Sequence, residues 1–171
     1  MQSLPKGKII ESIIQKSVEL GARRIVPLMT GRVVTHLDEK EKVSKREKWQ
    51  MVAIEAIKQC GAAWLPEIET PVTIEQILAR KETFELSLVG SLQTDRRHPR
   101  GCFQEFQAKH GRLPQSVAVW IGPEGDFTLD ELKVIQASGA LPISLGRLVL
   151  RVETAAIYCL SILNYELQAA R

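Results

Sequence analysis

Two glycine-containing turns hold the residues that could do chemistry. The first spans residues 121–128, with the sequence IGPEGDFT, and follows a continuous apolar run. Gly122 and Gly125 permit backbone angles closed to other residues and let a ligand approach the main chain. Thr128 is a predicted cap, and it begins a helix whose amide end favours polar or negative groups. The segment therefore predicts a ligand-binding turn, although an ordinary strand-to-helix turn explains the same residues.

The second segment spans residues 144–156, with the sequence SLGRLVLRVETAA. Its stretch 145–150 is an apolar loop, whereas solvent-exposed loops are polar, so we expect it to pack against a ligand, a partner subunit or the rest of the fold. Arg151 and Glu153 flank the start of the last helix, where a carboxylate is favoured by the helix dipole. A buried structural loop with a surface arginine explains these residues as well.

Other kinds of site are excluded by spacing. Neither turn contains GxGxxG or GxxxxGK[ST], so the dinucleotide fingerprint and the phosphate-binding P-loop are both absent. Cys60, Cys102 and Cys159 show no CxxC spacing and no histidine at zinc spacing. We therefore expect three reduced, buried thiols and no metal.

The elements that position the two turns alternate along the chain. Helical spacing of apolar residues from Ile9 to Val18 and two capping boxes, Thr73 with Gln76 and Thr128 with Glu131, mark helices. Predicted helices cover about 9–18, 38–62, 73–78, 102–109, 128–139 and 153–169, and predicted strands cover 24–29, 65–70, 86–89, 117–121 and 142–145. This alternation predicts an α/β fold, a mostly parallel sheet flanked by helices. Both turns then follow the carboxyl ends of strands, where such sheets bind ligands.

Composition sets the broad class. The chain has 171 residues, 44% of them hydrophobic and 25% charged, which predicts one globular domain and excludes global disorder. No apolar run is long enough to cross a membrane, and the first residues contain no signal core, so we expect a cytoplasmic protein without membrane contact. The net charge is +3, with the positive excess in residues 1–60. That polarity mildly favours a polyanion partner, and from composition alone a solvated basic face without a ligand explains it better.

The two turns, taken together in this order, resemble a known signature. Residues 121–128 and 144–156, together with IQKSVELG at 14–21, WQMVAIEAIKQ at 49–59 and LPEI at 65–68, are similar to the RsmE family of SPOUT-class methyltransferases. These enzymes methylate N3 of a uridine in small-subunit ribosomal RNA. The resemblance extends over about residues 5–167. Asp126 stands where the family has a second glycine, and Ala62 stands where an arginine is common.

The resemblance implies a SPOUT-type fold with a deep trefoil knot near the C-terminus and S-adenosylmethionine as cofactor. Family members carry a PUA-like RNA-binding domain at their N-terminus, and this chain starts after it, so we expect residues 1–171 to form a single methyltransferase domain. The implied cofactor contacts are Leu88, Val89, Ile121, Gly122, Pro123, Glu124, Gly125, Leu145, Gly146, Leu148, Leu150, Thr154 and Ala155.

The implied reaction needs a charged group at the target base. N3 of uracil carries a proton at neutral pH and becomes a nucleophile only when that proton is lost, which requires a general base or a cation that stabilises the uridinate. We expect Arg151 to be the cation and Glu153 the base, and a salt bridge across a subunit interface is the alternative for Arg151. The expected contacts to ribosomal RNA are Lys16, Arg32, Arg96, Arg97 and Arg100, each of which has solvated charge as its alternative.

SPOUT domains are usually homodimers, so the resemblance also implies a homodimer that buries part of the last helix. Packing of this helix within one subunit explains its apolar residues as well. Two other functions remain open from the sequence. One is a non-catalytic RNA-binding or ribosome-associated module on the same scaffold, and the other is a SPOUT enzyme that modifies another RNA position, such as a ribose 2′-hydroxyl.

Overall fold

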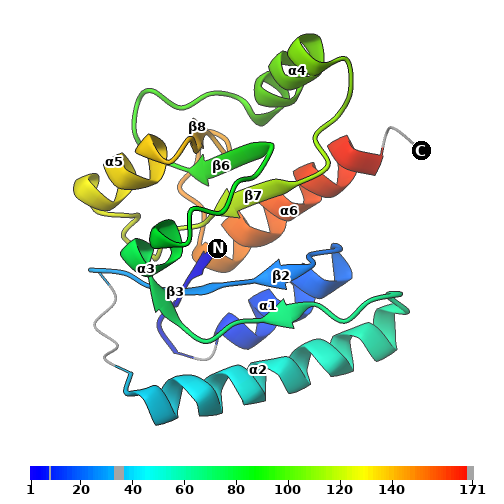
Figure 1. The fold of residues 1–171 in the computed structure, drawn as a ribbon, viewed down its shortest axis with the longest axis vertical. Coiled ribbons are helices and arrows are strands. Elements are labelled where there is room, and N and C mark those ends of the chain that lie inside the picture. Colours follow the sequence, from blue (N-terminus) through cyan, green and yellow to red (C-terminus); the bar gives the residue numbers. More distant parts are fainter. Residues whose placement is uncertain (8, 33–36, 169–171) are drawn as a thin grey trace.

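The computed structural model describes residues 1–7, 9–32 and 37–168. Its elements alternate as expected for an α/β fold (Figure 1). The strands are β1 (Gln2–Ser3), β2 (Arg24–Ile25), β3 (Pro27–Met29), β4 (Glu67–Ile68), β5 (Val72–Thr73), β6 (Leu86–Gly90), β7 (Val117–Trp120) and β8 (Leu141–Ile143). The helices are α1 (Ile9–Glu19), α2 (Glu39–Cys60), α3 (Ile74–Ala79), α4 (Pro99–His110), α5 (Leu129–Ala137) and α6 (Val152–Gln168).

Every strand pair is parallel, and the pairs form three small sheets that backbone contacts connect into one layer. On one side, β4 pairs with β2, and β5 pairs with β3, which follows β2 after a single residue. On the other side, β6 lies between β7 and β8. The link is β1, which pairs with β3 and bridges Gln2 to Ile121 at the end of β7. The predicted fold class, a parallel sheet flanked by helices, is confirmed.

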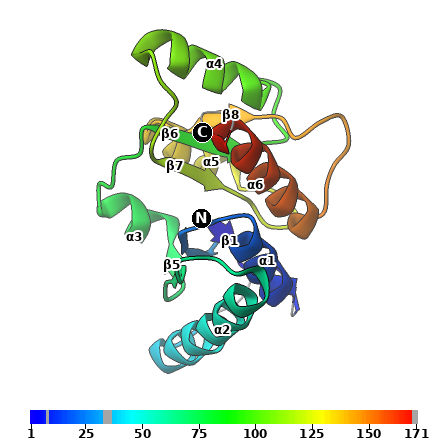
Figure 2. The same cartoon turned by 90° about the vertical axis from the view of Figure 1, so that its right-hand side faces the viewer.

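Helices cover both faces of this sheet. One apolar cluster packs α1 and α2 against Ile25 and Ile68, and a second packs α4 and α6 against Leu88 and Ile143. A third cluster on the opposite face joins α3 and α5 to Val89 and Trp120. Because neighbouring residues of β6 enter different clusters, the strand is buried on both faces. Figure 2 shows α1, α2 and α6 following one another along one side of the sheet.

The predicted caps define helix starts. The Thr73 and Thr128 hydroxyls each accept a hydrogen bond from the backbone amide three residues later, and their own backbone amides donate to the Gln76 and Glu131 side chains, which confirms both capping boxes. A third box, formed by Asp38 with Glu41, starts α2. Helix α4 begins at Pro99, earlier than expected, because the His98 side chain caps it and proline suits a first helical position.

Three sequence expectations need correction. The sequence does not predict strands β1 and β5, because each has only two residues and so shows no alternation of polar and apolar side chains. Proline within a predicted strand indicates a sheet edge or a strand end. Pro27 is not at an edge, because β3 lies between β1 and β5, and it is instead the first residue of the strand. Cys60 is exposed at the end of α2, whereas Cys102 and Cys159 are buried as expected.

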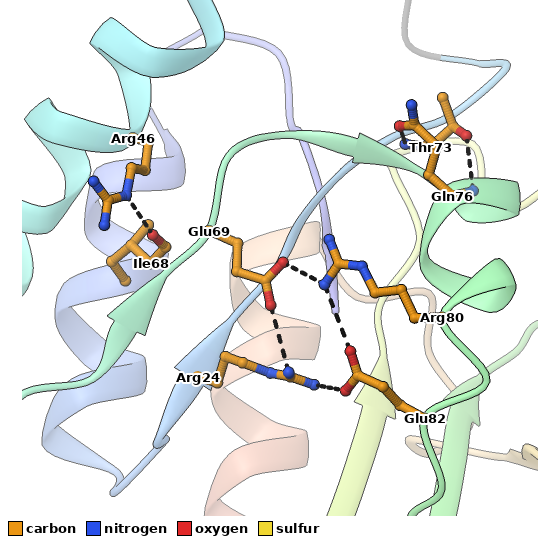
Figure 3. A network of polar contacts seen from close by, with 8 residues as sticks. All are labelled: Arg24, Arg46, Ile68, Glu69, Thr73, Gln76, Arg80 and Glu82. Carbon is orange, nitrogen blue, oxygen red and sulfur yellow. Dashed lines mark hydrogen bonds and ion pairs between the residues drawn. The ribbon is translucent and has the colours of Figure 1, made fainter.

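A network of four charged side chains fastens β2 and the β4–β5 segment to the end of α3 (Figure 3). Arg24 pairs with Glu82 and, over 3.5 Å, with Glu69. Arg80 pairs with Glu69 over 2.7 Å and with Glu82 over 3.5 Å. The hydrogen bond from Arg24 is the main cause that holds the pKa of Glu82 below its usual value.

Among the helices in the described ranges, none combines the length and apolarity that a membrane crossing demands.

Candidate active site

Three loops meet where β6, β7 and β8 end. They are residues 91–98 after β6, 121–128 after β7 and 144–151 after β8, and together they enclose a pocket that reaches the first turn of α6. The lining residues are Gly90, Ser91, Leu92, Arg96, Ile121, Gly122, Pro123, Glu124, Asp126, Leu145, Gly146, Leu148, Val149, Leu150, Val152 and Ala155. The carboxyl edge of a parallel sheet is where α/β folds bind ligands, so this pocket is the candidate active site.

Backbone hydrogen bonds tie the first loop to the strand beside it. The amide of Ser91 donates to the carbonyl of Ile143 over 3.1 Å, and the amide of Arg97 donates to Pro142 over 2.9 Å. The amide of Ser144 in turn donates to the carbonyl of Arg97 over 2.8 Å. These contacts hold both ends of the 91–98 loop against β8.

The glycine turn is held by hydrogen bonds within it and by bonds from other segments. The Asp126 amide donates to the Pro123 carbonyl over 2.9 Å, and the Lys6 amide donates to Glu124 Oε1 over 2.9 Å. A Cβ on Gly122 would lie 3.1 Å from Asp126 Oδ1 and 3.1 Å from the Phe127 nitrogen. We expected Gly122 to leave space for a ligand, whereas the structure shows that the turn itself occupies that space.

The 144–151 connection differs from expectation in its burial. Leu148 is 78% exposed and Val149 is 74% exposed, so these side chains do not pack against the rest of the fold. Figure 2 shows the connection, in orange, extending away from the sheet on its way to α6. Gly146 has φ +115°, and a Cβ there would meet nothing within 4 Å. The position therefore favours glycine because of its backbone conformation and not because a side chain would clash. A ligand or a second subunit remains as the packing partner of this loop.

The structure brings most of the expected cofactor contacts together. The lining includes Ile121, Gly122, Pro123, Glu124, Leu145, Gly146, Leu148, Leu150 and Ala155. Leu88 and Val89 do not reach it, because both are fully buried within β6. Gly125 and Thr154 also lie outside the lining. Sequence reasoning missed six lining residues, because no local pattern shows which residues of three separate loops will face one pocket; they are Gly90, Ser91, Leu92, Asp126, Val149 and Val152.

The two residues expected to be catalytic lie at the rim. Arg151 stands between Leu150 and Val152, which both line the pocket, and its side chain is exposed. Its carbonyl accepts a hydrogen bond from the Ala155 amide over 2.8 Å, which starts α6. Glu153 is half-buried in the first turn of α6, and neither residue is part of the lining itself.

The predicted RNA contacts divide into two groups. Three are paired with acids: Lys16 with Glu19 at 2.9 Å, Arg97 with Glu105 at 3.0 Å and Arg100 with Glu166 at 3.7 Å. The other two face the site. Arg96 lines the pocket, and the Cδ of Arg32 lies 3.3 Å from where a Cβ of Gly125 would be.

The position of Arg32 follows from the loop after β3. The Gly31 amide donates to Glu131 Oε1 over 2.8 Å, while Oε2 of the same carboxylate accepts from the Thr128 amide over 2.7 Å. Glu131 therefore holds two loops of the sheet edge together, and this brings Arg32 beside the glycine turn.

The described ranges contain no group of three or more His, Cys, Asp or Glu placed to hold a metal ion. A family model described as the RNA methyltransferase domain matches residues 1–164. The chain belongs to this family. The expected resemblance is thereby confirmed, and the pocket lies within the matched residues.

Relatives of this RNA methyltransferase domain extend the comparison. The ribosomal RNA small subunit methyltransferases E of Bacillus subtilis and of a Synechocystis species are each 34% identical over 98% of the chain. A solved methyltransferase from Legionella pneumophila, in complex with the cofactor SAM, is 37% identical over 99% of the chain, with a TM-score of 0.83. The chain spans 65% and 52% of the two curated relatives and 64% of the Legionella chain.

Proposed function

We propose that this chain is the catalytic domain of an S-adenosylmethionine-dependent methyltransferase that acts on N3 of a uridine in small-subunit ribosomal RNA. The observation that carries the proposal is the pocket at the carboxyl edge of β6, β7 and β8, in a chain of the RNA methyltransferase family. The names of the curated relatives support the substrate, and the bound cofactor of the Legionella protein supports the ligand. Such a substrate places the reaction in the cytoplasm.

The pocket lining fits S-adenosylmethionine. An adenosine needs apolar surface and backbone hydrogen-bonding groups, which Ile121, Leu145, Leu150 and the glycine turns supply. The lining also contains the carboxylate of Glu124, which complements the positive charge of a sulfonium and an amino group. When bound, this cofactor supplies a methyl group that its sulfur has already activated.

The chain's own residues then have two tasks, alignment and charge stabilisation. The apolar side chains exclude water from the pocket, and the loop backbones orient the ligand. We assign Arg151, exposed at the rim, to the stabilisation of the negative charge that develops on the uracil ring as N3 loses its proton. Glu153, two residues further on in the first turn of α6, is the proposed acceptor of that proton.

RNA contacts are proposed at the same edge. Arg96 lines the pocket and Arg32 lies beside the glycine turn, where its guanidinium donates to the Asp126 carbonyl over 3.5 Å, so both cations are placed to contact phosphates. Lys16, Arg97 and Arg100 would need to exchange their carboxylate partners for phosphates, and we assign them secondary contacts. We propose the chain as a single catalytic domain over residues 1–171.

Two further features of the proposal concern shape and assembly. We propose that the 144–151 connection forms part of a deep trefoil knot. We also propose a two-fold homodimer in which Leu148, Val149 and the exposed face of α6, including Tyr158 and Tyr165, are covered by a second copy. Exposed apolar side chains of this kind mark interaction surfaces. Sedimentation at tens of micromolar tests the dimer: Leu148→Asp is expected to yield a monomer, and a wild-type monomer of 19.2 kDa would overturn it.

Isothermal titration with S-adenosylmethionine tests the cofactor pocket. Leu145→Arg places a charged side chain in the lining and is expected to abolish binding. Leu129→Arg, at an exposed position in the first turn of α5, is the matched control and is expected to bind normally. A wild-type chain without measurable binding would favour a non-catalytic RNA-binding module instead.

Single-turnover transfer of a labelled methyl group to small-subunit particles, at saturating cofactor, tests the reaction. Arg151→Ala is expected to slow transfer by roughly 10²–10³-fold, the effect of losing one group that stabilises developing charge, with unchanged cofactor affinity. Arg147→Ala, an exposed arginine in the same connection, is the control. If Arg151→Ala lost cofactor affinity and kept the wild-type rate at saturation, Arg151 would belong to the binding pocket. Mass mapping of the product identifies the modified atom.

A further inference from the structure

One side chain joins two of the three loops that enclose the pocket. Oδ2 of Asp126, in the turn after β7, accepts a hydrogen bond from the Leu92 amide over 3.1 Å. Oδ1 of the same carboxylate accepts from the Phe127 amide over 2.8 Å. Asp126 and Leu92 both line the pocket, although they are 34 residues apart in the chain. A single carboxylate thus connects the 91–98 loop to the glycine turn.

The middle of the 91–98 loop has few other attachments. Its ends are held to β8 through Ser91 and Arg97. Between them, the Gln93 amide donates to Ser91 Oγ over 3.1 Å, and the Arg96 guanidinium donates to the Ser91 carbonyl over 3.3 Å, so both contacts stay within the loop. One exposed contact reaches α5, where Gln136 Nε2 donates to Asp95 Oδ2 over 3.3 Å. Among the hydrogen bonds of the described residues, the one to Asp126 is what holds the Leu92 amide to the neighbouring turn.

The backbone of Asp126 is strained for a residue with a side chain. Its φ is +63°, in the left-handed region, and Lys81 is the other described non-glycine residue with a positive φ. Glycine adopts this conformation without steric cost, and aspartate tolerates it better than most residues because its short side chain bonds locally. A carboxylate at this position therefore carries a conformational cost, which its two charge-assisted hydrogen bonds offset.

We propose that Asp126 is a positioning residue that fastens the 91–98 loop to the turn after β7 and thereby sets the affinity of the pocket for its ligand. The identity of that ligand, S-adenosylmethionine, rests on the proposed function. The attachment itself is a property of the free protein. With Leu92 held in place, the pocket wall is preformed, so binding does not have to order the loop.

Asp126→Gly and Asp126→Asn test this role by amide hydrogen exchange on the free protein. Glycine removes both acceptors, so exchange at Leu92 and Phe127 is expected to rise by about tenfold or more, the effect of losing a hydrogen bond to a charged group. Asparagine retains one carbonyl oxygen for two amides, so we expect one of the two to stay protected. Exchange in β6 and α6 is expected to stay unchanged. Asp130→Asn, on an exposed side chain of the next helix, is the control.

Titration with S-adenosylmethionine and thermal unfolding complete the test. The affinity of Asp126→Gly is expected to fall about tenfold, with an intermediate loss for Asp126→Asn. The thermal midpoint is expected to change little, because glycine also relieves the positive φ. If Asp126 only stabilised the fold, its variants would instead lose affinity for S-adenosylmethionine in proportion to the fall in their thermal midpoint.

The outcomes separate this inference from the proposed function. Unchanged exchange at Leu92 in Asp126→Gly would overturn the attachment, and faster exchange with unchanged affinity would overturn the positioning role. If the wild type bound no S-adenosylmethionine, the proposed function would fail, while exchange at Leu92 would still decide whether Asp126 holds the loop.

Discussion

Replacing Gly122 by alanine tests how tightly the turn after β7 is packed. A Cβ at this position would lie 3.1 Å from Asp126 Oδ1, 3.1 Å from the Phe127 nitrogen and 3.3 Å from the Asp126 carbonyl carbon. The φ of Gly122 is not in the left-handed region, so alanine adds a methyl group without backbone strain. Two of the three close atoms belong to the backbone, which cannot rotate away, and the third is engaged in a hydrogen bond.

The cost follows from this crowding. Inserting a methyl group into a well-packed site costs about 1–3 kcal/mol of unfolding free energy. For a chain of this size, each kcal/mol lowers the thermal midpoint by roughly 2–4 °C. We therefore expect Gly122→Ala to lower the thermal midpoint by roughly 2–12 °C. Ligand affinity is expected to fall only if the added methyl group displaces the turn.

Urea denaturation provides the assay. The midpoint concentration is expected to fall at constant slope, since the surface exposed on unfolding does not change. Gly101→Ala is the matched control: Gly101 lies in α4 with nothing within 4 Å of its Cβ position, so alanine there is expected to be neutral or to stabilise by about 0.5–1 kcal/mol. Because Asp126 Oδ1 is one of the closest atoms, Asp126→Gly is expected to recover part of the loss. Wild-type stability of Gly122→Ala would refute this explanation of the glycine.

Three other predictions follow from burial, charge and capping. Burial raises the pKa of the Cys159 thiol to about 12, so a thiol reagent is expected to modify exposed Cys60 and to leave Cys159 unmodified until the protein unfolds. Equal labelling rates would contradict this. The pKa of Glu82 is lowered, chiefly by the hydrogen bond from Arg24, so the ionised carboxylate stabilises the fold fully above its ordinary pKa of 4.5, and this stabilisation is lost as the pH falls below that value. The difference in unfolding free energy between wild type and Glu82→Gln, measured by denaturation from pH 6 to 3, is therefore expected to shrink towards pH 3. Thr128→Ala removes the α5 capping box and is expected to cost about 1 kcal/mol in urea denaturation, whereas a loss below measurement error would mean that the cap is dispensable.

The elements of the fold could be predicted where local chemistry decides them. The capping boxes at Thr73 and Thr128 marked two helix starts, because their hydrogen bonds join residues three apart. The mostly apolar runs of β6 and β7 predict strands, since strands buried on both faces are rich in apolar side chains. The two turns of the site followed from the order of these elements.

Other features depend on contacts between distant segments. The two polar residues of β1, Gln2 and Ser3, have no local pattern, yet they join the halves of the sheet because their backbone meets both β3 and β7. Position 122 favours glycine because Asp126 and Phe127 of the same turn lie close to where a Cβ would be. The spacing between Gly122 and Gly125 in the sequence does not reveal this contact.

The sequence by itself determined the α/β class, most helices and strands, and the two turns at which a ligand would bind, because periodicity, capping and glycine placement act within a few residues. Only the tertiary structure decided which side chains of three loops line one pocket, that Leu148 and Val149 remain exposed, and that Asp126 reaches Leu92. These features depend on the path of each loop beyond the sheet and on the segment that it contacts there. Packing between elements far apart in the chain fixes that path, and the residues next to the loop in the sequence do not.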